Sequence, residues 1–411
     1  MSVIPEKNST AKELLRLPVI IAAFGYLVDM YDLFLFSVVR VPSLQSLGLQ
    51  DDELLHKGAL LLNMQMAGLL IGGIIWGVLG DKKGRLSVLF GSILIYSLAN
   101  IANGFVQSVP QYAAMRFIAG IGLAGELGAG VTLVTEVLPK RIRGYGTTLV
   151  ATLGVIGAIL AYFMADLFQW RISYFIGGGL GLLLLVMRIR VFESGIYLRT
   201  KVMQISRGNF LSLFANRKKL LKYLQCIAIG LPIWFVVGIL ITFSPEFGKA
   251  MGLSGPVVAG KAVMLAFAGQ VVGDIASGLF SQFFHSRKKI IGLFIGMVAI
   301  MISVYLLLPF REVGSFYLVC VLLGFSNGYW ALFVTVAAEL FGTNLRATVA
   351  TTVPNFVRGA TIPLTMLFLW LKPHWGIVYS AGAVGLLTVM LAVVALWWMD
   401  ETFEKDLDYL E

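Results

Sequence analysis

The feature that most constrains this chain is a series of long apolar segments that recurs from one end to the other. Each segment is about 20–25 residues long, the length that an α-helix needs to cross a hydrocarbon core of about 30 Å. Hydrophobic residues make up 58% of the 411 residues and charged residues 13%, whereas soluble domains average roughly 45–50% and 25%. No soluble core could bury so much apolar surface. The sequence therefore predicts an all-α membrane protein with twelve transmembrane helices.

The twelve expected spans divide into six and six around the longest and most basic connection of the chain. They run over residues 17–40, 58–79, 86–106, 111–135, 145–166, 172–192, 221–244, 257–280, 290–309, 315–340, 347–370 and 376–399. We predict an N-terminal six-helix bundle over residues 1–192, a cytoplasmic basic linker over residues 193–220 and a C-terminal six-helix bundle over residues 221–411.

The distribution of lysine and arginine predicts the orientation of the chain in the membrane. The side that carries both termini and the linker has 23 of these residues, and the opposite side has 6. Cytoplasmic loops carry such an excess. We therefore expect a multi-pass protein of the plasma (inner) membrane with both termini in the cytoplasm. Because the basic residues form short clusters between apolar runs, they indicate contact with the lipid bilayer and not with nucleic acid.

Matching cytoplasmic loops indicate an internal repeat. "GVLGDKKGR" (77–85) follows the second span, and "GLFSQFFHSRKK" (278–289) follows the eighth. "TEVLPKRIRG" (135–144) and "AELFGTNLRA" (338–347) hold the same places after the fourth and tenth spans. Two such halves are typical of transporters that alternate access to a central site.

Several other classes of function lack their motifs in this sequence. There is no GxxxxGK[ST] loop for ATP, and the histidines at 56, 285 and 374 are scattered without metal-ligand spacing. We therefore expect no cofactor, no metal site and no enzymatic activity.

The first loop has the pattern G-x-x-x-D-x-x-G-R, and the fourth span has R-x-x-x-G-x-G. Through these motifs the chain resembles the major facilitator superfamily over all twelve spans. The resemblance implies a cytoplasmic gate between the halves, formed by Gly77, Asp81, Gly84, Arg85, Glu136 and Arg143. In the second copy of the loop, Gln282 stands where the acid belongs and His285 stands where the glycine belongs.

The stretches "DMYD" (29–32) and "GELGAG" (125–130) are most similar to the metabolite:proton symporters, a sugar-porter-like branch of the superfamily. Met30 and Leu127 replace the aromatic residues that are usual there. The proline-bearing glycine motif of antiporters is absent from "GVIGAILA" (154–161), which argues against drug:proton exchange.

Three acids and an arginine are the expected proton-coupling residues: Asp29, Asp32, Glu126 and Arg116. At roughly 1.5 Å per residue, Asp32 lies about 12 Å and Arg116 about 7 Å below the outer end of its span. An acid and an arginine at similar depth can pair, and the pair can break when the acid takes a proton. Asp29, one turn deeper than Asp32, and Glu126 can also titrate or hold a substrate ammonium. A permanent Asp32–Arg116 bridge that only holds helices together is the alternative.

Arg358 lies at the middle of the eleventh span, where an arginine without a partner is costly. It can bind a carboxylate bidentately, or it can be a buried partner of Glu126 or Asp29. The remaining expected substrate-binding residues, which can shape the pocket, are Tyr31, Trp234, Gln270, Asn327, Trp330 and Asn355.

We conclude from the sequence that the chain is a secondary active transporter of a small carboxylate-bearing solute, such as an organic acid, an amino acid or a betaine. Its expected partners are that solute and protons, and we expect it to act as a monomer. An exporter of drugs, siderophores or metabolites is the alternative, and a transporter-like sensor is a more distant one.

Overall fold

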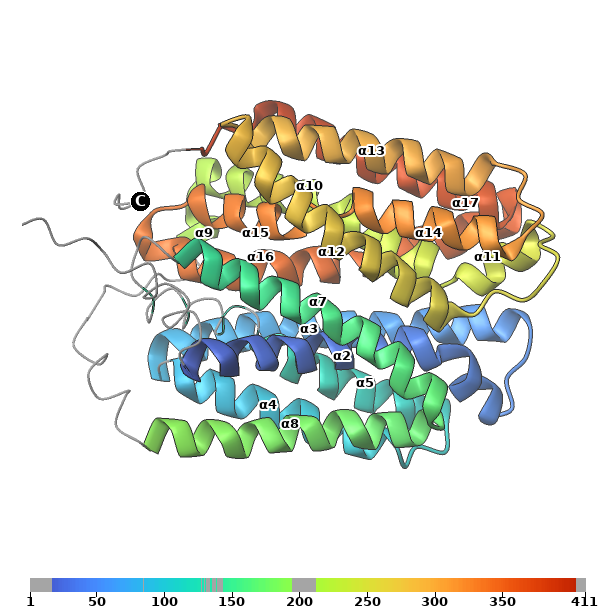
Figure 1. Cartoon of the computed structure of the whole chain (residues 1–411), viewed down its shortest axis with the longest axis horizontal. Coiled ribbons are helices and arrows are strands. Elements are labelled where there is room, and N and C mark those ends of the chain that lie inside the picture. The colour runs from blue at the N-terminus through green and yellow to red at the C-terminus, as the bar shows by residue number, and fades with distance from the viewer. Residues whose placement is uncertain are drawn as a thin grey trace, which may run out of the picture.

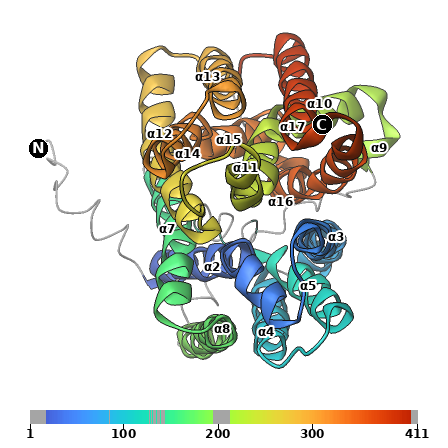
Figure 2. The ribbon, with the colours of Figure 1, turned by 90° about the vertical axis from the view of Figure 1, so that its right-hand side faces the viewer.

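The computed structural model describes residues 17–83, 85–126, 128, 130, 134, 138, 143–193 and 212–403. These residues form helices and short connections, and none of them lies in a strand. The helices make two bundles, one below the other in Figure 1, and both are seen end-on in Figure 2. The all-α prediction is confirmed.

The lower bundle in Figure 1 is built from the first half of the chain. Its helices are α2 (Leu17–Ser46), α3 (Asp52–Lys83), α4 (Arg85–Asn103), α5 (Val109–Leu123), α7 (Arg143–Leu167) and α8 (Trp170–Glu193).

The upper bundle is built from the second half. Its helices are α9 (Ser212–Ala215), α10 (Arg217–Phe235), the π-helix η3 (Val236–Ile241), α11 (Ser244–Ala250), α12 (Ala259–Phe283), α13 (Arg287–Leu307), α14 (Val313–Ser326), α15 (Trp330–Glu339), α16 (Thr343–Gly359) and α17 (Thr361–Trp398). Of the predicted linker, residues 194–211 lie outside the described residues.

The predicted spans correspond to these elements. By length and composition, eight helical stretches of the described chain could each cross a membrane. One of them, Thr348–Trp398, holds two spans, because Gly376 (φ 72°) interrupts the helix between the segments predicted over 347–370 and 376–399. α4, α5 and α7 account for the rest, so the twelve-span prediction is confirmed.

Some spans are interrupted near their middle. α10 continues directly into the π-helix η3, and the tenth span is divided into α14 and α15. The eleventh span is divided between α16 and α17, at Ala360, two residues after Arg358. Interrupted membrane helices expose backbone and side-chain groups at mid-depth, where transporters build their sites.

Equivalent helix pairs in the two halves are packed by glycines. α3 packs against α5 in the first half, and α12 packs against α14 in the second. A Cβ added at Gly68, Gly120, Gly269 or Gly324 would overlap a backbone carbonyl oxygen of the partner helix. Only glycine allows this approach, which explains Gly120 of the R-x-x-x-G-x-G motif.

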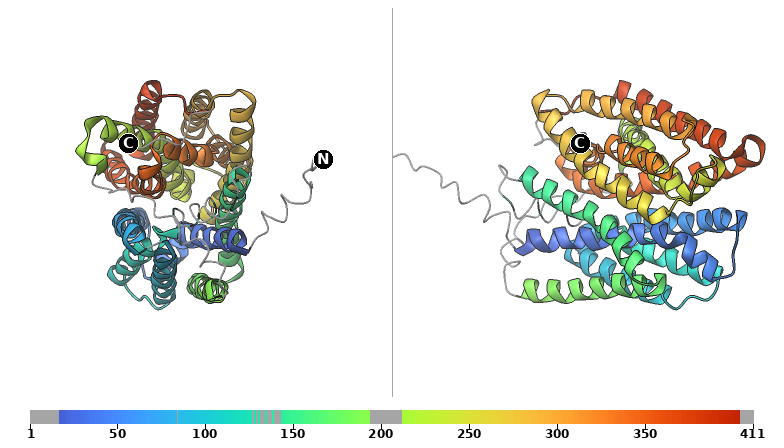
Figure 3. Two further views of the ribbon diagram at one scale, coloured as in Figure 1. Left: turned by 90° about the vertical axis from the view of Figure 1, so that its left-hand side faces the viewer. Right: turned by 45° about the vertical axis from the view of Figure 1, so that its right-hand side comes forward.

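The two halves meet along α2, α3 and α7 on one side and α12, α16 and α17 on the other. Figure 3 shows α7 lying beside α12 at one edge of this interface. The start of α2 and the last described residues, 401–403, lie at the same end of the molecule, on the left in Figure 1. The opposite end carries the α2–α3 and α11–α12 connections and is the expected outer end.

Candidate functional site

Arg358 is the fixed cation at the interface between the halves. It is 1% exposed and lies in the last turn of α16, where the helix dipole favours a positive charge. Its Cζ lies 5.6 Å from the ring centre of Trp234 and 5.7 Å from that of Trp330. Among the described residues it donates one hydrogen bond, from Nη1 to Asn355 Oδ1, which is long at 3.4 Å, and Nε has no partner there. The guanidinium therefore retains donors for an anion.

A small void adjoins Arg358 where α2, α10, η3, α12, α15 and α16 converge. Its lining is Met30, Phe34, Ile233, Trp234, Val237, Phe267, Gln270, Trp330 and Arg358. The space open to the centre of a water molecule is about 10 Å³, which is roughly the room that one water needs. The aromatic side chains make the void mainly apolar, with Arg358 and Gln270 as its polar groups.

Asp29 and Asp32 lie on α2, and both side chains are fully buried. Neither carboxyl accepts a hydrogen bond of normal geometry from the described residues, although the Asn100 side chain interacts with Asp32. The strongest attracting charge on Asp29 is Arg358, and the strongest on Asp32 is Arg116. A buried carboxylate without hydrogen bonds is costly, and protonation removes that cost. The two aspartates thus have the environment that proton carriers require.

Arg116 donates hydrogen bonds to two asparagines of α4. Its Nη2 donates to Asn100 Oδ1 at 2.6 Å and its Nε to Asn103 Oδ1 at 3.3 Å, and its Cζ lies 4.8 Å from the Tyr174 ring centre. No ion pair joins Arg116 to Asp32 among the described residues. The expected pair is therefore present as neighbouring charges and is separated in this conformation.

Glu126 forms a buried ion pair with Arg188 of α8, which was not among the expected site residues. Arg188 Nη1 donates to Glu126 Oε2 at 3.1 Å and to the Leu89 carbonyl at 3.2 Å, and Nη2 donates to Oε1. A Cβ at Gly25 would overlap this pair. The position of Arg188 inside the apolar segment 172–192 was the signal that could have revealed it.

The other expected binding residues divide into two groups. Trp234, Gln270 and Trp330 line the void. Tyr31 donates to the Ser173 carbonyl at 2.9 Å, and Asn327 donates to the Ile233 carbonyl at 3.2 Å.

Asn355 joins the two halves, because its Nδ2 donates to the Ala124 carbonyl at 2.9 Å. It therefore links the helix that carries Arg358 to the segment that carries Glu126.

Most of the expected cytoplasmic gate lies outside the described residues. This holds for Gly84 and Glu136 and for the side chains of Asp81, Arg85 and Arg143. Gly77 is described and faces Thr352 of α16 across the interface.

The second copy of this loop is described in full. His285, in the place of the glycine, has φ 47°, the left-handed conformation that favours glycine. Arg287 Nε pairs with Glu339 Oε2 at 2.7 Å. Glu401 accepts from Ser286 Oγ and from the Arg287 amide at the start of α13.

Hydrogen bonds set the titration of Glu401. Burial acts to raise the pKa of its carboxyl, but the bonds from Ser286 and from backbone amides lower the pKa below its usual value. Glu401 is therefore ionised at neutral pH and anchors the C-terminal segment to α13.

The end of the molecule that is expected to be the outer one is closed by ion pairs that the sequence did not predict. Arg40 of α2 binds Glu246 of α11 through two bonds of 2.7 Å. Arg40 is fully buried, donates to the Leu54 and Thr242 carbonyls, and lies 4.7 Å from the ring centre of Phe243.

Two exposed pairs accompany this buried one, Lys249–Asp51 and Lys372–Asp52. Each of the three joins one half of the molecule to the other.

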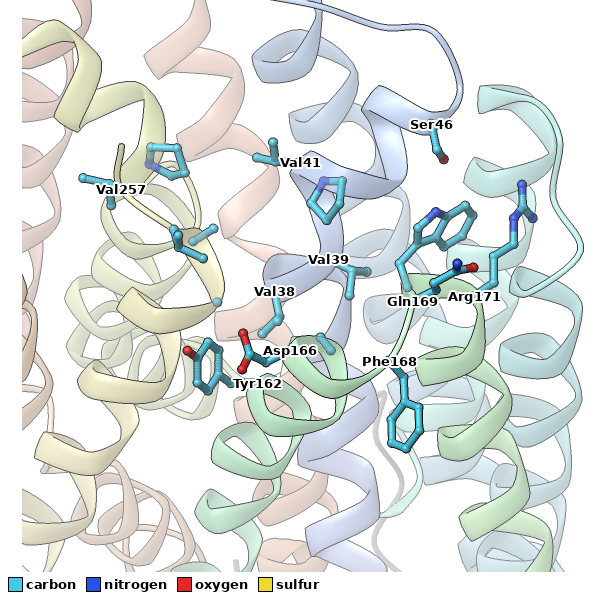
Figure 4. A pocket seen from close by; sticks show the side chains of 17 residues that line it. Val38, Val39, Val41, Ser46, Tyr162, Asp166, Phe168, Gln169, Arg171 and Val257 are labelled. Atoms are coloured by element: carbon cyan, nitrogen blue, oxygen red, sulfur yellow. The ribbon is translucent and has the colours of Figure 1, made fainter. Parts of the chain in front are cut away.

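A larger cavity lies at the same end of the molecule and is separate from the Arg358 void. It has a volume of about 640 Å³ between α2, α7, α8 and the α11–α12 region. Figure 4 shows Val38, Tyr162 and Asp166 on one side of it and Arg171 on another. None of the residues around Arg358 lines it.

The structure has two matching bundles of membrane-spanning helices, with buried charges between them and ion pairs across one end. This arrangement is typical of the class of secondary transporters. A family model described as "Major Facilitator Superfamily" matches residues 22–362, and the chain belongs to this family. It is a membrane transporter and not an enzyme.

Individual relatives and a solved structure agree with this assignment. The chain is 26% identical over 367 residues to the niacin transporter NiaP of Acinetobacter baylyi, covering 80% of each chain. It is 26% identical over 393 residues to a probable 4-methylmuconolactone transporter of Cupriavidus pinatubonensis, covering 92% of this chain and 89% of the relative. A crystal structure of a D-xylose-proton symporter matches with a TM-score of 0.69 at 17% identity, covering 95% of this chain and 99% of the other. This last likeness is one of fold.

Proposed function

We propose that the protein imports a small aromatic or other planar carboxylate together with protons, by alternating access. The observation that carries this proposal is Arg358, a buried cation with an unpartnered Nε and two flanking indole rings. A guanidinium binds a carboxylate through two parallel hydrogen bonds. Indole rings favour stacked or edge-on contact with a flat ring. Niacin, the substrate in the name of one relative, combines these two features.

Proton coupling is supported by the buried acids of α2. A substrate anion near Arg358 would lie in the field of Asp29, and protonation of Asp29 and Asp32 would remove their repulsion of that anion. Release of the proton toward the cytoplasm would restore the repulsion and favour release of the substrate. This order couples the two solutes without any covalent chemistry.

Alternating access is supported by the closed outer end. The void at Arg358 holds about one water, so a carboxylate the size of niacin requires the halves to separate. We propose that they rock about this site, in an inner membrane with both termini in the cytoplasm. The lysine and arginine bias of the sequence supports this orientation. We further propose that one chain is the transporting unit.

The test is binding of an aromatic carboxylate and its neutral amide, with benzoate and benzamide or niacin and nicotinamide as pairs. Wild type should prefer the acid. Arg358→Ala should lose roughly 1.5–3 kcal/mol of binding free energy to the acid, about a tenfold to hundredfold loss of affinity. Arg358→Lys should recover only part of the lost affinity for the acid, because an ammonium group lacks the planar pair of donors that a guanidinium offers.

Arg311→Ala is the matched control, because Arg311 is an exposed arginine of the same half. It should bind the acid as wild type does. Equal preference for the acid in wild type and Arg358→Ala would remove Arg358 from the site. Uptake of radiolabelled acid into proteoliposomes with an alkaline interior would support import, whereas accumulation only under the reverse gradient would favour the exporter.

A further inference from the structure

The tenth span is broken beside the void, and the break is held by contacts from other helices. α14 ends at Ser326, and α15 begins at Trp330. Tyr329 Oη donates to the Ile229 carbonyl of α10 at 3.0 Å. Gly328 lies so close to the backbone of Gly273 in α12 that a Cβ there would overlap it. The first residue of α15 is therefore fixed relative to both α10 and α12.

Asp274 of α12 lies directly at the start of α15. Its Oδ1 accepts a hydrogen bond from the Ala331 amide at 3.1 Å. The Trp330 amide and the Gln270 side chain interact with the same carboxyl group. The amides of a first helical turn have no partner within their own helix, and Tyr329, the residue before α15, makes no capping bond with its side chain. Asp274 thus caps α15 from a different helix.

The residues that Asp274 contacts are the ones that face Arg358. Trp330 and Gln270 both line the void, whereas Asp274 itself does not. The Trp330 ring lies 6.4 Å from the Trp234 ring and 5.7 Å from the Arg358 guanidinium, measured between centres. A shift of the first turn of α15 would move this indole and open the arrangement around the guanidinium.

We propose that Asp274 is a positioning residue that fixes Trp330 and Gln270 by capping the broken helix α15, and that it thereby sets the preference of the site for flat aromatic acids. This inference rests on the proposed function for the identity of the ligand. The positioning itself rests only on the contacts between α12 and α15. A carboxyl oxygen that accepts from an amide at the start of α15 satisfies a donor that has no partner within its own helix, which explains an acid at this depth in the membrane.

Three variants separate positioning from other roles. Asp274→Ala removes the cap, while Asp274→Asn keeps an oxygen that can accept from the Ala331 amide. Ser277→Ala is the matched control, because Ser277 lies on the same helix and donates to the Asp274 backbone carbonyl, not to its carboxyl group.

The first measurement is amide hydrogen exchange of a peptide that covers the first turn of α15, in the full-length protein without substrate. Asp274→Ala should speed exchange at Ala331 by about tenfold, the size expected for loss of a helix cap. Asp274→Asn and Ser277→Ala should stay close to wild type. Unchanged exchange in Asp274→Ala would overturn the proposal.

The second measurement is the affinity ratio between benzoate and an aliphatic acid of similar size, such as hexanoate. Asp274→Ala should lower this ratio as Trp330→Ala does, and the double variant should lower it no further. Additive losses would mean that Asp274 acts independently of Trp330, which overturns the proposal. Loss of proton-driven uptake in Asp274→Asn, with normal exchange and binding, would identify a proton carrier instead.

The exchange result distinguishes failure of this inference from failure of the proposed function. If wild type binds no aromatic acid but Asp274→Ala still loosens α15, the proposed substrate class is wrong and the positioning role stands.

Discussion

Glu246→Gln is expected to loosen the outer end of the transporter and to shift the protein toward the state that is open outward. In the closed state Glu246 neutralises Arg40, a fully buried cation, through two charge-assisted bonds of 2.7 Å. Removing one partner of a buried pair costs about 3–5 kcal/mol, because the remaining charge is left uncompensated.

The cost is smaller here because Glu246 is 17% exposed and glutamine can still accept one bond. We therefore expect a loss of about 2 kcal/mol from the closed state, which is roughly a thirtyfold change in the closed-to-open ratio.

The assay is alkylation from outside by a membrane-impermeant maleimide. Both native cysteines, Cys226 and Cys320, are buried, and a cysteine placed at Met30 would report on the void. In proteoliposomes, labelling at this position should be about ten to thirty times faster with Glu246→Gln than without it.

Asp51→Asn is the control for this assay. Asp51 and Lys249 also join the two halves at the outer end, but both side chains are 80% exposed. Exposed pairs contribute at most about 1 kcal/mol, so this variant should label at the wild-type rate. If Glu246→Gln also labels at that rate while its melting temperature falls, Arg40–Glu246 is a structural pair and not a gate.

Three further outcomes are expected. Asp32→Asn should abolish accumulation driven by a pH gradient while substrate exchange survives, and unchanged accumulation would leave Asp32 as a structural residue. His285→Gly should raise the free energy of unfolding by up to about 1 kcal/mol, because glycine relieves the left-handed backbone. A lower melting temperature in this variant would mean that the contact of His285 with the Phe403 ring (5.3 Å) outweighs the backbone strain. Because the folded-state pKa of Glu401 is lowered, its stabilising contribution is present above the ordinary carboxyl range and is lost as pH falls through the lowered value. Glu401→Gln should therefore lower the melting temperature at pH 7, and the difference from wild type should shrink as pH falls through the lowered pKa.

The sequence predicted the spans well because segment length and apolar content follow directly from the thickness of the bilayer. The turn at Gly376, for example, lies where two predicted segments meet. The depth of a residue along its helix could also be predicted from the sequence, and it placed Asp32 and Arg116 at similar depths in the membrane. Depth does not say which face of a helix a side chain occupies, so the pairing of Glu126 with Arg188 was missed.

Contacts between distant segments explain the other omissions. Arg40 and Glu246 are 206 positions apart, and only the assembled interface brings them together. The cap on α15 depends on a break in a span that reads as continuous from its composition. Asp274 had no assignable role until that break was visible.

The glycine packing within each half has a mechanical consequence. α3 with α5, and α12 with α14, touch backbone to backbone, and no side chain lies between them at Gly68, Gly120, Gly269 and Gly324 that could adjust its rotamer. Such contacts leave no room for rearrangement, so each helix pair behaves as a rigid unit. Flexibility is then concentrated at the interface between the halves, where longer side chains and ion pairs can exchange partners. We therefore expect conformational change at the interface between the halves and not within a helix pair. Gly120→Ala should impair folding of the N-terminal half before it alters the transport cycle.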